Sequence, residues 1–227
     1  MLYAIDIDKT IAIDRVGSAR WLNNCLSLGI PERTITSIAA YWQFLELAPV
    51  QAFREQHEQA FQVALTCADQ EPEVLLAMEP LPGALAGVKR LAEHHRILYT
   101  TCRRQTSMEV TRAWLASAGF PSPESAISCS WYHDKYVHAH QAASQQEPVI
   151  LIDDLMEEVV KSFGIVAREH YQVAVSLLRR VEVVGFGYAR WPDALPRKLP
   201  FATSLLASWD ALETWLEQKE RDGVTPE

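Results

Sequence analysis

The sequence predicts an α/β fold, in which a parallel sheet lies between helices and an all-helical segment follows the first strand. Short apolar runs, typical of buried strands, alternate with helical stretches over most of the chain. From about residue 14 to 79 these runs are missing, and aromatic residues recur at helical spacing. The 227 residues, 48% apolar and 22% charged, suffice for one large domain or one domain with an insertion.

The first strand is expected at residues 2–7, an apolar run that ends in acidic side chains. Helices are expected to follow, because three prolines lie where a helix start tolerates the missing N–H. These helices would span residues 15–28, 32–47, 50–66 and 72–78.

The remaining elements alternate in type. Strands are expected at residues 96–101, 125–129, 148–152 and 181–188. Helices are expected from Pro82 to His95 and from the end of the strand at 96–101 to Ala118. Further helices are expected at 134–145, over 155–180, where there are one or two, and from Ser208 onward. Because helical crossovers join parallel strands, this order predicts a Rossmann-like parallel sheet core. We therefore expect a core domain from residues 1–12 and 80–220, a helical domain at 13–79 and a frayed tail at 221–227.

Composition limits the partners. The net charge of −8 argues against a nucleic-acid polymer, which needs clustered Lys and Arg. No apolar stretch approaches the roughly 18 residues of a membrane span, and the N-terminus does not resemble a signal peptide. We therefore expect a cytoplasmic protein with no membrane partner and with four reduced cysteines, because these are widely spaced. Monomer and homodimer both remain open.

Two of the expected strands end in paired acidic residues. Asp6 and Asp8 follow the first strand, and Asp153 and Asp154 follow the apolar run at 148–152. Neighbouring parallel strands lie about 4.8 Å apart, so such ends can share one ion. Unpaired buried carboxylates are costly, and a divalent cation is the obvious partner. Without metal, we expect mutual repulsion to raise the pKa of at least one of them.

These motifs resemble those of the haloacid dehalogenase-like hydrolase superfamily. Asp6-Ile7-Asp8-Lys9-Thr10 matches its Asp-x-Asp-x-Thr motif, and Thr101 matches the Thr or Ser that ends a later strand. Lys135 matches the Lys at the start of a helix, and Asp153-Asp154 matches the last acidic pair. The helical segment resembles the cap that many members carry between the first two motifs.

The resemblance implies an Mg²⁺-dependent phosphohydrolase that acts on a small phosphorylated metabolite through an aspartyl-phosphate. Asp6 would be the nucleophile, and Asp8 would be the general acid and then the base. Thr101 and Lys135 would bind the phosphoryl group, and Arg103 would touch phosphate or substrate unless it is a solvated helix-start residue. Magnesium would be held by the carboxylates of Asp6 and Asp153 and by the backbone carbonyl of Asp8. Asp154 would be a further ligand through water, or would support the other ligands.

Several alternatives remain open. Thr100 could face the phosphate in place of Thr101, and Lys161 could replace Lys135. Asp8-Lys9-Thr10 also resembles the motif of transport ATPases, but the following Gly-Thr and the membrane spans are missing. His133, His138 and His140 surround Lys135 and could form a zinc cluster, although polar loop histidines are the simpler interpretation.

The substrate and the reaction also stay open. Arg15, Arg20, Trp21 and Trp42 are candidates for substrate contact from the cap, although core packing is the simpler role for both tryptophans. Aromatic side chains that stack on a base would favour a nucleoside monophosphate. A phosphotransferase or phosphomutase, or a catalytically idle binding module, are the alternatives to a phosphatase.

Overall fold

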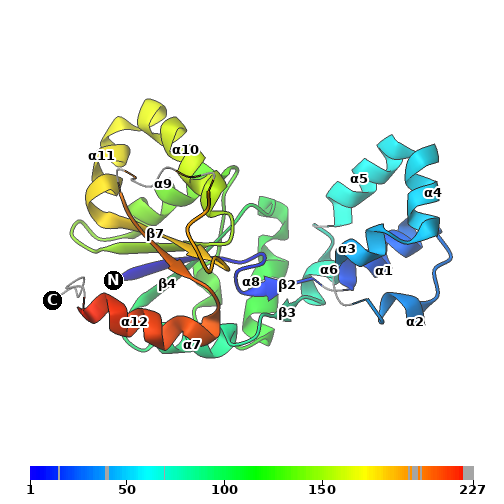
Figure 1. Cartoon of the computed structure of the whole chain (residues 1–227), viewed down its shortest axis with the longest axis horizontal. Helices are drawn as coiled ribbons and strands as arrows, with labels where there is room; N and C mark the ends of the chain where they lie inside the picture. The colour runs from blue at the N-terminus through cyan, green and yellow to red at the C-terminus, as the bar shows by residue number, and fades with distance from the viewer. Residues whose placement is uncertain are drawn as a thin grey trace.

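A six-stranded parallel sheet in the order β5-β4-β1-β6-β7-β8 forms the centre of the fold (Figure 1). The computed structural model of the chain describes residues 1–14, 16–38, 41–68, 70–193, 195, 199 and 201–221. The strands are β1 (Leu2–Asp6), β4 (Arg96–Thr101), β5 (Ile127–Ser128), β6 (Val149–Asp153), β7 (Val181–Phe186) and β8 (Ala202–Leu206). Every residue of β1, β6 and β7 is buried, which explains their nearly continuous apolar sequences.

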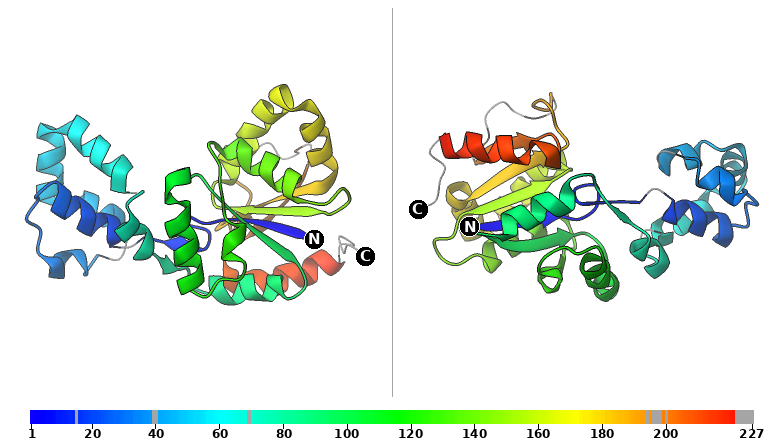
Figure 2. Two further views of the ribbon diagram at one scale, coloured as in Figure 1. Left: turned by 180° about the vertical axis from the view of Figure 1, so that it is seen from behind. Right: turned by 90° about the horizontal axis from the view of Figure 1, so that it is seen from below.

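Helices cover both faces of this sheet (Figures 1 and 2). They are α7 (Ala84–Ala92), α8 (Met108–Ser117), α9 (Tyr132–Ala142), α10 (Met156–Glu169), α11 (Tyr171–Arg180) and α12 (Leu212–Arg221). Because strand side chains alternate, Ile5 packs on one face with residues of α7, α8 and α12, whereas Ala4 packs on the other with residues of α9, α10 and α11. The prediction of an α/β fold with a parallel sheet is thus confirmed.

A separate helical segment, α1 to α6, lies between β1 and β4 in the sequence and to one side of the sheet (Figure 1). Its helices are α1 (Gly17–Cys25), α2 (Glu32–Ile35), α3 (Tyr41–Leu45), α4 (Ala48–Gln56), α5 (Glu58–Ala68) and α6 (Pro72–Leu76). Leu22, Phe44 and Phe61 belong to a hydrophobic cluster of its own. The short antiparallel strands β2 (Ala12–Ile13) and β3 (Glu79–Pro80) pair where the chain leaves the core and returns. The domain boundaries near 13 and 79 stay a prediction.

Several elements differ from the prediction. The expected helix at 32–47 is two short helices, α2 and α3, and the one at 50–66 begins at Ala48 and breaks at His57, whose φ of −139° is not helical. The strand expected at 181–188 ends at Phe186, because Gly187 turns the chain at a φ of 81°. Strand β8 and the β2–β3 pair were not predicted.

Within the described ranges, no helix is both long and apolar enough to cross a membrane. All four cysteines are free thiols, as expected.

Candidate active site

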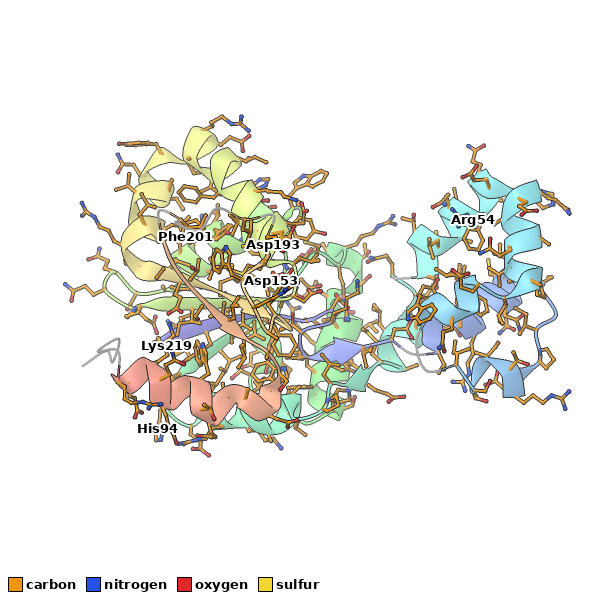
Figure 3. The ribbon with its side chains drawn as sticks, in the orientation of Figure 1. Arg54, His94, Asp153, Asp193, Phe201 and Lys219 are labelled. Atoms are coloured by element: carbon orange, nitrogen blue, oxygen red, sulfur yellow. The ribbon has the colours of Figure 1, made fainter. Side chains whose placement is uncertain are left out.

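Three carboxylates gather where β1 and β6 end. These strands are parallel neighbours, paired from Leu2–Val149 to Ile5–Ile152, so the side chains of Asp6 and Asp153 reach the same edge of the sheet. Carboxylate oxygens of Asp6, Asp153 and Asp154 all lie within 4.8 Å of one another. Strand β1 runs from the N-terminus toward the helical segment, and the label of Asp153, the last residue of β6, lies over the part of the molecule that holds the sheet (Figures 1 and 3). Asp6, from the first acidic pair in the sequence, therefore lies beside both members of the second pair.

Lys135 joins two of these carboxylates. It lies in the first turn of α9, and its Nζ donates to Asp6 Oδ1 at 2.7 Å and to Asp153 Oδ2 at 2.6 Å. The side chain is only 2% exposed. Burial disfavours the ammonium, but the charges of Asp6 and Asp153 outweigh burial and raise the pKa of Lys135 well above its ordinary value. Lys135 is thus placed where the motif predicted, whereas Lys161 is an exposed α10 residue paired with Glu158.

The negative charge of the cluster is only partly neutralised. Burial, with added repulsion from Asp153 and Asp8, raises the pKa of Asp6 well above its ordinary value despite the opposing effect of Lys135. Burial, followed by repulsion from Asp153, also raises the pKa of Asp154, to about 6. The expectation of a raised pKa is therefore confirmed, although burial contributes more than the mutual repulsion that the sequence suggested.

The loop after β1 holds Asp6 from the other side. Lys9 has a φ of 63°, and its N–H donates to the carbonyl of Ala12, so the chain turns tightly. This turn lets the Thr10 hydroxyl donate to Asp6 Oδ2 at 3.3 Å and accept from the Asp154 N–H at 3.2 Å. The buried indole N–H of Trp209 donates to the Thr10 carbonyl at 2.7 Å. Sequence reasoning missed Trp209, because nothing local in the sequence connects it with this loop.

Asp8 points to a different set of partners. Its carboxylate accepts hydrogen bonds from Thr101 Oγ1 at 3.1 Å and from Arg103, whose Nη2 and Nε lie 2.7 and 3.1 Å from its two oxygens. Thr101 thus faces Asp8, whereas the Thr100 hydroxyl is buried with no hydrogen-bond partner among the described residues. The alternative of a solvated Arg103 is wrong, because that side chain is 3% exposed.

The acidic cluster suits a divalent cation. Lys135 binds one oxygen of Asp6 and one of Asp153. The second oxygens accept from Thr10 and from the Leu155 N–H, and each keeps a lone pair for a cation, as does the half-buried carboxylate of Asp154. Hard oxygen ligands of this kind are the ones that Mg²⁺ prefers. In the part of the chain that the structure describes, these three aspartates are the only group of three potential metal ligands, so the histidines near Lys135 form no zinc cluster.

The candidates for substrate contact on the helical segment are not gathered at this cluster. Trp21 is half-buried and lines a groove between α1 and α5, and Trp42 is 61% exposed on α3. Arg20 pairs with Glu32 at the surface of the segment. Arg15 lies outside the described residues. A role for these side chains in binding substrate stays a prediction.

Comparison with models of protein families and with curated proteins finds no match for the sequence. Solved structures do match. A haloacid dehalogenase-like family hydrolase from Deinococcus radiodurans, with bound phosphate and sodium, is 16% identical, with 96% of each chain covered and a TM-score of 0.53. A putative hydrolase of this kind from Bacillus subtilis, bound to magnesium, is 11% identical over 95% of this chain and 98% of that one, with a TM-score of 0.57.

A dehalogenase with an intermediate complex is also similar. It is 12% identical over 95% of this chain and 96% of that one, with a TM-score of 0.52. Proteins that share this arrangement of sheet and helices thus include one with bound phosphate, one with bound magnesium and a dehalogenase. At 11–16% identity, the likeness concerns the fold. The chain has the fold of the haloacid dehalogenase-like hydrolases.

Proposed function

We propose that this protein is a hydrolase that cleaves phosphoric monoesters of a small metabolite with the help of Mg²⁺. One observation carries the proposal. The Asp6 carboxylate lies at the end of β1, bonded to Lys135 and close to Asp153 and Asp154, while a second carboxylate, that of Asp8, follows two residues later. This arrangement pairs a nucleophile with an acid and base, next to positive charge.

In the first step, an oxygen of Asp6 attacks phosphorus and the bond from phosphorus to the leaving oxygen breaks. The leaving oxygen takes its proton from Asp8. In the second step, Asp8 takes a proton from water, and the water oxygen bonds to phosphorus. The bond between phosphorus and Asp6 then breaks and releases inorganic phosphate, so that both aspartates return to their starting state.

Positive charge is needed because the Asp6 carboxylate would otherwise repel an anionic phosphate. Lys135, held between Asp6 and Asp153, supplies part of it. Magnesium bound by Asp6, Asp153 and Asp154 would supply the rest, as Lewis acid and counter-charge. For Thr101, at the end of β4, to donate a hydrogen bond to the phosphoryl group, its one hydroxyl proton would have to turn from Asp8 to the substrate.

Asp8 also bears on the choice between a phosphatase and a dehalogenase. A dehalogenase of this fold needs no proton donor two residues after its nucleophile, because halide leaves without a proton. Here, two side chains from the neighbouring β4 region, Thr101 and Arg103, hold a carboxylate at that position. This favours an oxygen leaving group.

The first test is hydrolysis of 4-nitrophenyl phosphate with and without Mg²⁺. We expect metal-dependent turnover that falls on the order of 10³-fold or more in Asp6→Asn, since the nucleophile is lost. Glu169→Gln, which removes an exposed carboxylate at the end of α10, should leave the rate unchanged. A panel of sugar, nucleoside and carboxylic acid phosphates would then identify the leaving group.

No turnover of any phosphomonoester in that panel would contradict the proposal. Release of halide from a 2-haloacid, lost in Asp6→Asn and independent of Mg²⁺, would assign the site to dehalogenation instead. Transfer of the phosphoryl group to a sugar in place of water would identify a phosphotransferase.

A further inference from the structure

Most N–H donors of the Arg103 guanidinium have partners inside the protein. Besides Asp8, it donates to Thr111 Oγ1 at 3.2 Å through Nη1 and to Met78 Sδ at 2.8 Å through Nη2. Four of its five N–H donors thus have protein partners. A phosphoryl group bound by Asp6 and Lys135 would find at most one uncommitted N–H on this guanidinium, at Nη1, and no pair of neighbouring donors.

We propose that Arg103 is a positioning residue that orients the Asp8 carboxylate, rather than a ligand of the substrate's phosphoryl group. The inference rests on the proposed function, because it assigns a purpose to Asp8. The two bonds to Asp8 come from Nε and Nη2, which are the neighbouring donors of the guanidinium fork and match the two oxygens of a carboxylate.

Asp8 needs such support because its own surroundings constrain it weakly. It lies just beyond β1, in the tight turn at Lys9, and its side chain is 44% exposed. A carboxylate that donates and then accepts a proton must stay within hydrogen-bond reach of one point. A displacement of about 1 Å can cost 10²-fold in rate. Arg103 and Thr101 supply the side-chain hydrogen bonds that hold this carboxylate in place.

Arg103 is itself fixed from two directions. Thr111, on α8, accepts from Arg103 and donates to the Ser107 carbonyl, so its hydroxyl is oriented. Met78 comes directly before β3, where the chain returns from the helical segment, and its carbonyl accepts from the Trp114 indole. The orientation of Asp8 therefore depends on α8 and on the return from the helical segment, through a single arginine.

Two aryl phosphates of nearly equal size separate the two roles of Arg103. The phenolate of phenyl phosphate needs a proton as it leaves, whereas that of 4-nitrophenyl phosphate needs it much less. Since kcat/KM reports steps up to departure of the leaving group, a misplaced Asp8 should matter more for phenyl phosphate. We expect Arg103→Met to lower kcat/KM for phenyl phosphate at least about tenfold more than for 4-nitrophenyl phosphate.

Further variants complete the test. Asp8→Asn should show the same substrate dependence, and Asp8→Asn combined with Arg103→Met should be no slower than Asp8→Asn alone. Thr111→Val, which removes one anchor of Arg103, should cause a smaller change in the same direction. Arg104→Met removes a neighbouring exposed arginine and should change neither rate. Inhibition by inorganic phosphate should be equally strong in wild type and Arg103→Met.

The opposite pattern would overturn the inference. If Arg103 binds phosphate, Arg103→Met lowers kcat/KM equally for both substrates, weakens inhibition by inorganic phosphate, and adds its full effect to that of Asp8→Asn. Circular dichroism and thermal melting show whether each variant is folded. If Arg103→Met is not folded, the rates of Thr111→Val with the two substrates decide whether Arg103 orients Asp8 or binds phosphate. If the wild-type protein hydrolyses neither substrate, that result counts against the proposed function instead.

Discussion

At the scale of single residues, Lys135 decides whether the acidic cluster is compatible with a folded core. Two buried carboxylates, those of Asp6 and Asp153, share this one ammonium. Removing one partner of a buried ion pair typically costs 3–5 kcal/mol, because the remaining charge is left uncompensated. The same lysine thus serves the stability of the fold and the approach of an anionic substrate.

Replacing Lys135 tests this double role. We expect Lys135→Met to lower the free energy of unfolding by about 3–5 kcal/mol at pH 8 in the absence of metal. Lys161→Met is the matched control, because Lys161 is exposed and its pair with Glu158 contributes at most about 1 kcal/mol. Urea denaturation measures both. Equal stabilities of the two variants would mean that the buried pairs are not important for the fold.

At the scale of elements, Trp209, in the C-terminal part of the chain, packs against helix α7 and contacts the loop that follows β1. A Cβ atom at Gly87, on α7, would lie only 2.5 Å from Trp209 Cε3. The absence of a side chain at this position lets the indole pack against α7 and donate its N–H to the Thr10 carbonyl. Thr10 in turn contacts Asp6, so the position of α7 bears on the proposed nucleophile.

We therefore expect Gly87→Ala to destabilise the protein by about 1–3 kcal/mol through overpacking and to lower kcat, because the displaced indole releases the Thr10 loop. Gly164→Ala on α10 is the control. A Cβ there meets no described atom within 4 Å, so the change should stabilise the protein by about 0.5–1 kcal/mol. Chemical denaturation and turnover of 4-nitrophenyl phosphate report the two effects. A fully active, stable Gly87→Ala would refute this link.

At the scale of the whole molecule, the net charge of −8 and the buried acidic cluster make the protein a candidate for stabilisation by a divalent cation. A ligand that binds only the folded state stabilises it in proportion to the logarithm of its concentration over Kd. At about 100 times Kd this amounts to about 2.7 kcal/mol. The melting temperature of a chain of this size should then rise by several degrees.

We expect millimolar Mg²⁺ to raise the melting temperature, and EDTA to reverse the rise. Asp154→Asn should reduce the shift, because the amide is a poorer ligand, without lowering the stability of the metal-free protein, in which burial already disfavours the Asp154 carboxylate. Sodium chloride of equal ionic strength serves as the control for screening. An unchanged melting temperature in millimolar Mg²⁺ would argue against a metal site.

Much of the site could be predicted from the sequence because its signals are local. Apolar runs at residues 2–6 and 149–152 mark buried parallel strands, and the acidic residues that follow them lie at the same edge of such a sheet. Lys135 was singled out because the resemblance to the family's motifs implies a lysine at the start of a later helix. The helical character of residues 17–76 also follows from local periodicity, although its breaks at His57 and after Ile35 do not.

The sequence by itself determined the fold class, the two acidic strand ends and the candidate nucleophile. Only the tertiary structure decided that Thr101 rather than Thr100 faces Asp8, that Arg103 is buried against this carboxylate, and that Trp209 holds the loop of Thr10. It also added β8, a partly exposed strand whose pairing with β7 the local pattern does not reveal. The physical reason is that the patterns which predict strands and helices depend on residues that are neighbours in the sequence. Hydrogen bonds between residues far apart in the sequence depend on how the finished elements pack.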